Sequence, residues 1–139
     1  MNNLLLSTSS LKFHHLGVAC RDIEKEFSIW AQLGYRPEGT TFVDKTQGVK
    51  GLFLRGTGPR LELLEDLPGH KTVAPWLERG VKIYHTAFQV REIRKEIDFL
   101  TQNRARVVTP LVPACAFNGC LITFLMLKNL ALIELIELT

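Results

Sequence analysis

Two histidines and two glutamates are the residues best suited to chemistry in this sequence of 139 residues. His15 and His85 lie 70 positions apart, and Glu62 and Glu134 lie 72 positions apart. Two imidazoles and two carboxylates that converge on one point suit a borderline or hard divalent ion, such as Co, Ni, Zn, Mn or Mg. We therefore predict one divalent-metal site with these four residues as its ligands.

The sequence around these residues is repeated. Residues 15–26 (HLGVACRDIEKE) share His, Arg, Ile, Lys and Glu with residues 85–96 (HTAFQVREIRKE) at matching positions. Residues 61–65 (LELLE) match residues 133–137 (IELIE) in the same order along the chain. Two matches at nearly the same offset indicate an internal duplication. A pseudo-twofold axis would then bring the two histidines together with the two glutamates.

Each copy predicts a strand, a helix and three further strands. We expect strands over 13–20, 41–43, 49–55 and 60–64, then over 83–90, 106–109, 121–127 and 130–138. We expect helices over 22–33 and 92–101, with inward faces formed by Ile23, Phe27, Trp30 and Leu33, and by Ile93, Ile97 and Leu100. The predicted class is α+β, with two tandem βαβββ modules (about 12–67 and 82–138, linker 68–81) in one domain, 1–139. Side by side, they would form an eight-stranded half-open barrel with helices outside.

Side chains alternate between the two faces of a strand, and this alternation selects the residues that enter the barrel. His15 and His85 share faces with small residues, which leave room beside each ring. Glu62 and Glu134 lie in apolar strands, where a buried carboxylate is costly unless it is paired or bound to a metal. The opposite faces carry Glu65 and Glu137, which we expect in solvent, and His14, to which we assign no role in the chemistry.

Composition excludes several classes of function. Apolar residues make up 46% and charged residues 22% of the chain, as in ordinary globular proteins. The net charge of +3 comes from scattered basic residues, so we expect no nucleic-acid partner. No apolar run is long enough to span a membrane, and the first ten residues do not form a signal peptide. Three cysteines without a CxxC pair favour a soluble cytoplasmic protein with free thiols.

Several segments are similar to the vicinal oxygen chelate superfamily, also called the glyoxalase and bleomycin-resistance fold, over about 13–138. Within it, the sequence most resembles the methylmalonyl-CoA epimerases. The segments that carry this resemblance are HHLGVA at 14–19, QGV at 47–49, TVAPWL at 72–77, YHTAF at 84–88 and LIEL at 132–135.

The resemblance implies a metal-dependent isomerase, epimerase or lyase that moves a proton next to a carbonyl. It places the metal ligands at His15, Glu62, His85 and Glu134, with Glu134 and its counterpart Glu62 as the catalytic bases. Epimerases of this kind are expected to carry a second base where this chain has Gly51. The implied partner is a small molecule with vicinal oxygens, such as an acyl-CoA or a thiol adduct, and the implied assembly is a homodimer. The implied substrate-binding residues are Gln47, Phe117, Asn118 and Gly119.

Two alternatives stay open at this point. Bleomycin-resistance relatives use the same cradle to bind a drug without catalysis, although the complete set of four ligands here disfavours that function. Extradiol-type dioxygenases hold iron with two histidines and one carboxylate and keep positions open for oxygen. A fourth protein ligand would fill one of those positions, so we rank a dioxygenase third.

Overall fold

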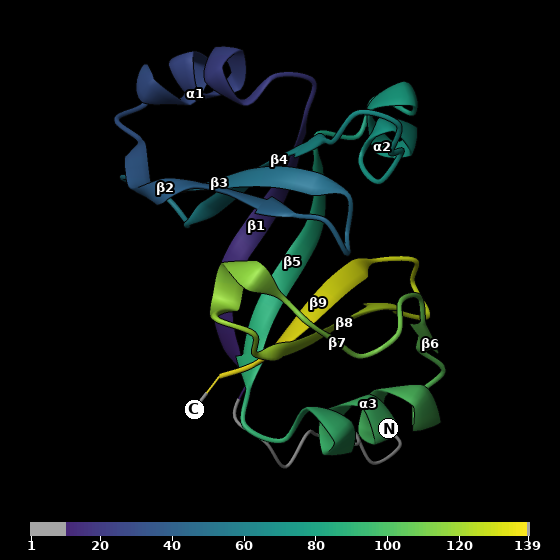
Figure 1. Cartoon of the computed structure of the whole chain (residues 1–139). Coiled ribbons are helices and arrows are strands. Elements are labelled where there is room, and N and C mark those ends of the chain that lie inside the picture. Colours follow the sequence, from purple (N-terminus) through teal and green to yellow (C-terminus); the bar gives the residue numbers. More distant parts are fainter. Residues whose placement is uncertain (1–10, 139) are drawn as a thin grey trace.

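The computed structural model describes residues 11–138, which form a mixed sheet of nine strands with helices outside it (Figure 1). The elements in chain order are β1 (Lys12–Cys20), α1 (Ile23–Ala31), β2 (Arg36–Asp44), β3 (Val49–Arg55), β4 (Leu61–Asp66), α2 (Ala74–Glu78), β5 (Ile83–Val90), α3 (Ile93–Gln102), β6 (Arg106–Val107), β7 (Val112–Pro113), the 3-10 turn η1 (Cys115–Phe117), β8 (Leu121–Met126) and β9 (Leu132–Glu137). The predicted α+β class is confirmed. No helix within residues 11–138 is long and apolar enough to cross a membrane.

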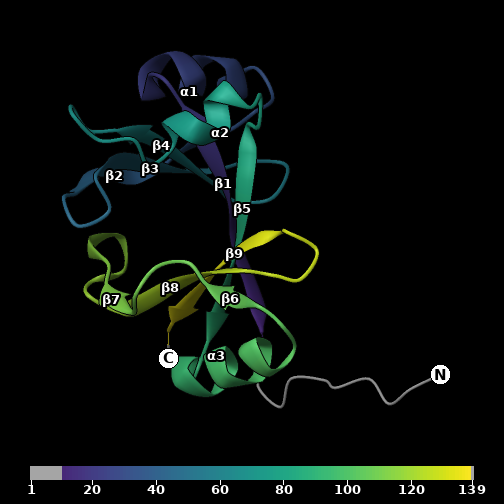
Figure 2. The ribbon, with the colours of Figure 1, turned by 90° about the vertical axis from the view of Figure 1, so that its right-hand side faces the viewer.

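The strand order β2-β3-β4-β1-β5-β9-β8-β6 consists of two halves that meet at β1 and β5. Figure 2 shows the halves one above the other along these two strands. The central pair is antiparallel, whereas β1 pairs with β4 and β5 pairs with β9 in parallel. Gly17 lies opposite Glu62, and its repeat equivalent Ala87 lies opposite Glu134. This common register supports the division into modules at about 12–67 and 82–138, which we retain as a proposal.

The sheet has nine strands rather than the predicted eight, because the segment after α3 is divided. The expected strand over 106–109 ends at Val107, and the short strand β7 follows at Val112. Both pair with β8, but Pro110 lies between them and lacks the N–H that would continue the ladder. At the other end of the sheet, β2 runs from Arg36 to Asp44 and is longer than predicted. The sheet is open, with β2 and β6 at the two ends of the path.

Each long helix packs its apolar face onto its own half of the sheet. Ile23 and Trp30 of α1 join one core cluster, and Ile93 and Ile97 of α3 join another, as predicted. Leu33 is 60% exposed, because α1 ends at Ala31 and the chain turns at Gly34, whose φ is +92°. Asp22 caps α1 by accepting the N–H of Lys25 at 3.0 Å.

The prediction that Glu65 and Glu137 face solvent is wrong. Both are half-buried, and each accepts a backbone N–H at the start of a helix. Glu65 accepts the N–H of Ile23, and Glu137 accepts that of Ile93, both at 2.9 Å. These residues lie on the face opposite Glu62 and Glu134, as expected, but that face is covered by the helices. The two strands that supply the candidate glutamate ligands, β4 and β9, therefore each also hold a helix N-terminus.

Candidate metal centre

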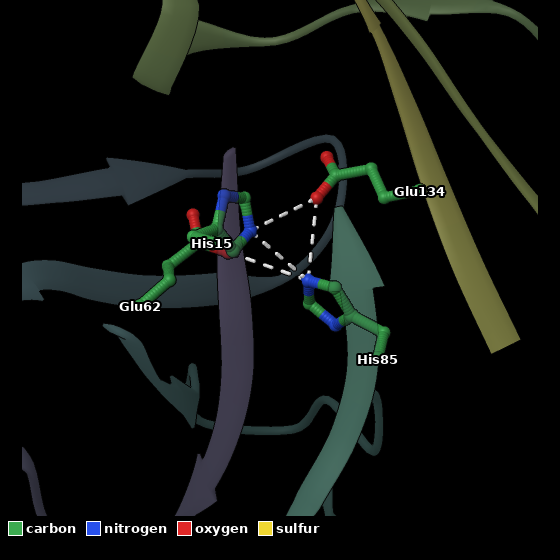
Figure 3. A group of neighbouring side chains, drawn as sticks. All are labelled: His15, Glu62, His85 and Glu134. Carbon is green, nitrogen blue, oxygen red and sulfur yellow. Dashed lines mark hydrogen bonds and ion pairs between the residues drawn. The ribbon is translucent and has the colours of Figure 1, made fainter. Parts of the chain in front are cut away.

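Four side chains from the four central strands point toward one another (Figure 3). The strand registers explain why they meet. Glu62, Gly17 and His85 form one row across β4, β1 and β5. His15, Ala87 and Glu134 form a second row across β1, β5 and β9. In each row a small residue separates the histidine from the glutamate, so the two longer side chains can bend over it and meet.

Gly17 is required by the close approach of the His85 ring. A Cβ atom built on Gly17 would overlap three atoms of this imidazole. The ring is almost fully enclosed, with His85 only 2% exposed, so it has little room to move away. The absence of a side chain at position 17 therefore determines where one candidate ligand lies.

The four candidate ligand atoms form a compact group. His15 Nε2 lies 3.2 Å from His85 Nε2, 3.0 Å from Glu62 Oε1 and 3.2 Å from Glu134 Oε1. His85 Nε2 lies 3.7 Å from Glu62 Oε1 and 3.2 Å from Glu134 Oε1. All four atoms lie within 4.8 Å of one another. Ligands of one zinc-sized ion lie about 2 Å from it, so spacings of this order are those of a shared ion.

The donor set and its burial fit a divalent cation. Each of the four residues is at most 5% exposed. The described residues include two buried side-chain polar atoms that lack a well-aligned hydrogen bond: His85 Nδ1, and Glu134 Oε1, whose contacts with Nε2 of His15 and of His85 are ion pairs at 3.2 Å. Buried carboxylates are costly, and a cation bound between Glu62 and Glu134 would compensate for their burial. The group could therefore hold one metal ion.

The electrostatics of the group favour positive charge at its centre. Burial alone would lower the pKa of His15, but the charge of Glu62 and hydrogen bonds to both glutamates raise it to about 9. Burial would raise the pKa of Glu134, but hydrogen bonds from His15 and His85 lower it to about 2. Without a metal, a proton on His15 therefore offsets part of the negative charge of the group. A site that holds a proton so strongly is also a good site for a cation.

His14 is a neighbour of the site that the sequence analysis missed. A register shift in β1 between Phe13 and His15 interrupts the alternation, so His14 also turns toward the site. Its Nδ1 atom lies 2.8 Å from Nδ1 of His15. Burial, followed by the charge of His15, lowers the pKa of His14 to about 4, so its ring is neutral and can accept this hydrogen bond. The Nδ1–H of His15 then donates to His14 and leaves Nε2 free for an ion.

Aromatic rings enclose the ligands. The ring of Phe117 stacks on His15 with centroids 6.2 Å apart, and Phe53 meets the same imidazole edge-on at 5.3 Å. Phe124 meets the ring of His85 edge-on at 5.1 Å. Phe117 ends η1, and the first residue of η1, Cys115, donates its thiol to the Val43 carbonyl of β2 at 3.2 Å. The loop of the second module thus reaches across to the first and covers the site.

The four predicted substrate-binding residues have different environments. Gln47 lines a cavity of about 370 Å³, while its side-chain amide donates to Asp44 at 2.8 Å. Phe117 is buried against His15. Asn118 and Gly119 are exposed and have φ values of +54° and +81°, so they shape the turn that ends η1.

Gly51, the expected place of a second base, faces an aromatic ring. Phe42 pairs with Gly51 across β2 and β3. A Cβ atom at position 51 would overlap the end of the Phe42 ring. The space next to the Gly51 backbone therefore belongs to Phe42, and a carboxylate at this position would have to displace that ring.

Residues 14–124 match the Glyoxalase/Bleomycin resistance protein/Dioxygenase superfamily. The chain belongs to this superfamily. The match covers most of the chain and includes three of the four candidate ligands, since Glu134 lies beyond its end. No curated protein sequence matches the chain.

Solved structures of the superfamily share the fold. The hypothetical protein BH1468 from Bacillus halodurans C-125 is 27% identical with a TM-score of 0.80, over 94% of this chain and 96% of that one. Methylmalonyl-CoA epimerase from Mycobacterium tuberculosis is 23% identical with a TM-score of 0.80, over 97% and 93%, and shows the fold alone. A variant of the Streptomyces coelicolor epimerase, in complex with 2-nitronate-propionyl-CoA, is 28% identical with a TM-score of 0.76, over 91% and 94%. The resemblance to this superfamily is thus confirmed.

Proposed function

We propose that this chain is a divalent-metal-dependent enzyme that transfers a proton at the carbon next to a carbonyl group. One observation carries the proposal: two imidazoles and two carboxylates meet in a buried group with unsatisfied polar atoms. His15, Glu62, His85 and Glu134 would hold the ion. One bound divalent ion would act as a Lewis acid toward two vicinal oxygens of the substrate.

Glu134 is the residue that we propose as the base. The hydrogen bonds that lower its pKa to about 2 keep it ionised but also make it a weak base. To take a proton, Glu134 would therefore have to swing away from the two histidines toward the substrate. It reaches the group from β9, whereas Glu62 reaches it from β4 on the other side of the histidine pair (Figure 3). Two carboxylates on opposite sides could serve the two faces of one carbon. Glu62 would then replace the base that an epimerase is expected to carry at position 51.

The substrate that we propose is a small molecule with vicinal oxygens, an acyl-CoA or a thiol adduct. Methylmalonyl-CoA epimerases among the similar structures were solved with 2-nitronate-propionyl-CoA and with methylmalonyl-CoA. The enclosing rings of Phe53 and Phe117 would keep water from the reacting carbon. Gly51 and the Phe42 ring beside it argue for a reaction that uses Glu62 and Glu134 as a pair.

The test combines metal content with proton exchange. Purified protein reconstituted with Co, Ni, Zn, Mn or Mg should bind about one ion per chain. It should exchange the α-proton of acyl-CoA thioesters or hemithioacetals with deuterium from solvent. The variant Glu134→Gln should abolish exchange, and Glu137→Gln, on the same strand but on the opposite face, should not. Exchange that survives in metal-loaded Glu134→Gln would refute the role of this residue.

A cavity next to the site supports a second candidate, a protein that binds a small apolar ligand without turnover. The cavity has a volume of about 370 Å³, within the range of small-molecule sites. Failure to bind any divalent ion after reconstitution, together with stoichiometric binding of an apolar ligand, would favour this candidate over the enzyme.

A further inference from the structure

A cavity of about 370 Å³ is lined by residues next to the candidate ligands, although none of the four ligands lines it. Phe124 lies opposite Glu134 in the pairing of β8 with β9, and Leu132 lies two residues before Glu134 on the same strand. Both residues line the cavity. Tyr84, a third lining residue, meets the His85 ring edge-on at 4.6 Å. A group attached to a molecule at the ligands could therefore extend into this space.

The wall of the cavity is apolar and carries no charge. Its described lining residues include no Asp, Glu, Lys, Arg or His. The second module contributes Tyr84, Val108, Pro110, Val112, Ile122, Phe124, Met126 and Leu132, and the linker contributes Trp76. The occupant of such a wall gains free energy by burying hydrocarbon surface.

Several polar groups on the wall are already bound to the protein itself. The side chain of Gln47 donates to Asp44 at 2.8 Å, and the hydroxyl of Thr72 donates to the Gln47 carbonyl at 2.6 Å. The hydroxyl oxygen of Thr109 accepts the backbone N–H of Phe124 at 2.9 Å. Because these polar atoms are engaged in hydrogen bonds within the protein, they are less available to a ligand in the cavity. A carboxylate that entered the cavity would lose its hydration without gaining a cationic partner on the wall.

The size of the cavity indicates that its occupant is larger than a methyl group. One water molecule takes up about 30 Å³ in the liquid, and a methylene group is of similar size, so the cavity has room for roughly a dozen such groups. A single methyl would leave most of the apolar wall without contacts, and an unfilled apolar space forfeits dispersion energy.

We propose that the substrate carries, beside its two metal-binding oxygens, an uncharged apolar group of several carbons that occupies this cavity. The proposal rests on the function proposed above and narrows its substrate class. Acyl compounds with a medium-length alkyl or an aromatic substituent fit, whereas a substrate with only a methyl substituent does not use the space.

Alkyl hydroxamates test this inference, because a hydroxamate presents two vicinal oxygens to a metal and can carry a chain of any length. Their affinity for the metal-loaded protein would be measured by calorimetry from acetohydroxamate to octanohydroxamate. Binding should tighten about fourfold with each added methylene until the cavity is full. Four methylenes should therefore give a gain of roughly 250-fold. Retention of the metal is checked in every sample.

A matched pair of variants tests whether the alkyl chain of the hydroxamate occupies the cavity. Met126 lines the cavity, so Met126→Trp should fill part of it and remove at least tenfold of the affinity gained from acetohydroxamate to hexanohydroxamate. Val107, on the neighbouring strand β6, is 48% exposed and pairs opposite Leu125 rather than Met126. Val107→Trp introduces the same side chain outside the cavity and should retain the full gain.

The outcomes separate this inference from the proposed function. If the metal-loaded protein binds acetohydroxamate but longer chains bind no more tightly, the inference is overturned and the metal function stands. If no ion binds, the proposed function fails, and the series is repeated on metal-free protein with straight-chain alcohols. A gain of about fourfold per methylene would then still support an apolar site, whereas constant affinity would overturn it.

Discussion

The metal-free protein should lose stability as the pH rises above about 6.5. His15 has a pKa of about 9 in the folded protein, against an ordinary value of 6.5, which we take for the unfolded chain. Below 6.5 both states hold this proton, and between 6.5 and 9 only the folded state holds it. Unfolding then releases a proton, so higher pH favours the unfolded chain. The full difference is worth on the order of 3 kcal/mol, a large part of the stability of a small domain.

The acid side should show the opposite slope. Burial lowers the pKa of His14 to about 4, and hydrogen bonds from the histidines lower that of Glu134 to about 2, although burial alone would raise it. The unfolded chain therefore binds more protons than the folded protein as the pH falls below about 6.5. Together with the loss of the His15 proton in alkali, this places the maximum stability of the metal-free protein near pH 6.5.

Urea unfolding in the presence of a chelator, between about pH 5 and pH 9, measures both slopes. Glu62→Gln removes the charge that does most to raise the pKa of His15, so it should flatten the alkaline slope. His70→Gln, at an exposed position in the linker, should retain that slope and serves as the control. A wild-type stability that stays constant or increases from about pH 6.5 to pH 9 would refute the electrostatic argument for the site.

Three further predictions concern single positions. His14→Ala should weaken metal binding roughly 10- to 100-fold in a competition titration, because His15 loses the partner that orients its ring. Gly51→Ala should lower the free energy of unfolding by about 1–3 kcal/mol, and adding Phe42→Ala should recover part of this loss; no recovery would contradict the overlap. Glu65→Ala and Glu137→Ala should each cost about 1 kcal/mol in urea unfolding, and a cost confined to one of them would contradict their equivalence as helix caps.

The sequence predicted the fold class and the grouping of the four candidate ligands because both follow from a repeated pattern. Period-two alternation predicts which face of a strand each residue occupies, and the matching offsets predict which strands are equivalent. Neither prediction requires the conformation of the loops. His14 was missed because a register shift reverses the alternation next to it, and such shifts leave little trace in one sequence. Glu65 and Glu137 were placed on the correct face, but the wrong environment, because alternation does not reveal what covers a face.

The apolar cavity could not have been predicted from the strand pattern. Its wall combines Trp76 from the linker segment with Val108 from the irregular stretch between β6 and β7. These residues meet only after the two halves of the sheet have paired through β1 and β5. The position of Phe42 beside Gly51 was not predicted either, because it depends on the register between the adjacent strands β2 and β3.

The symmetric division of the donor set has a consequence for the mechanics of the chain. Each half supplies one imidazole and one carboxylate, so neither half alone offers more than two donors to an ion. A bound ion would link the two halves next to β1 and β5, the strands through which they pair. The binding free energy of that ion would therefore also stabilise the relative orientation of the two halves. Selection on metal affinity would thereby also be selection on the shape of the whole cradle.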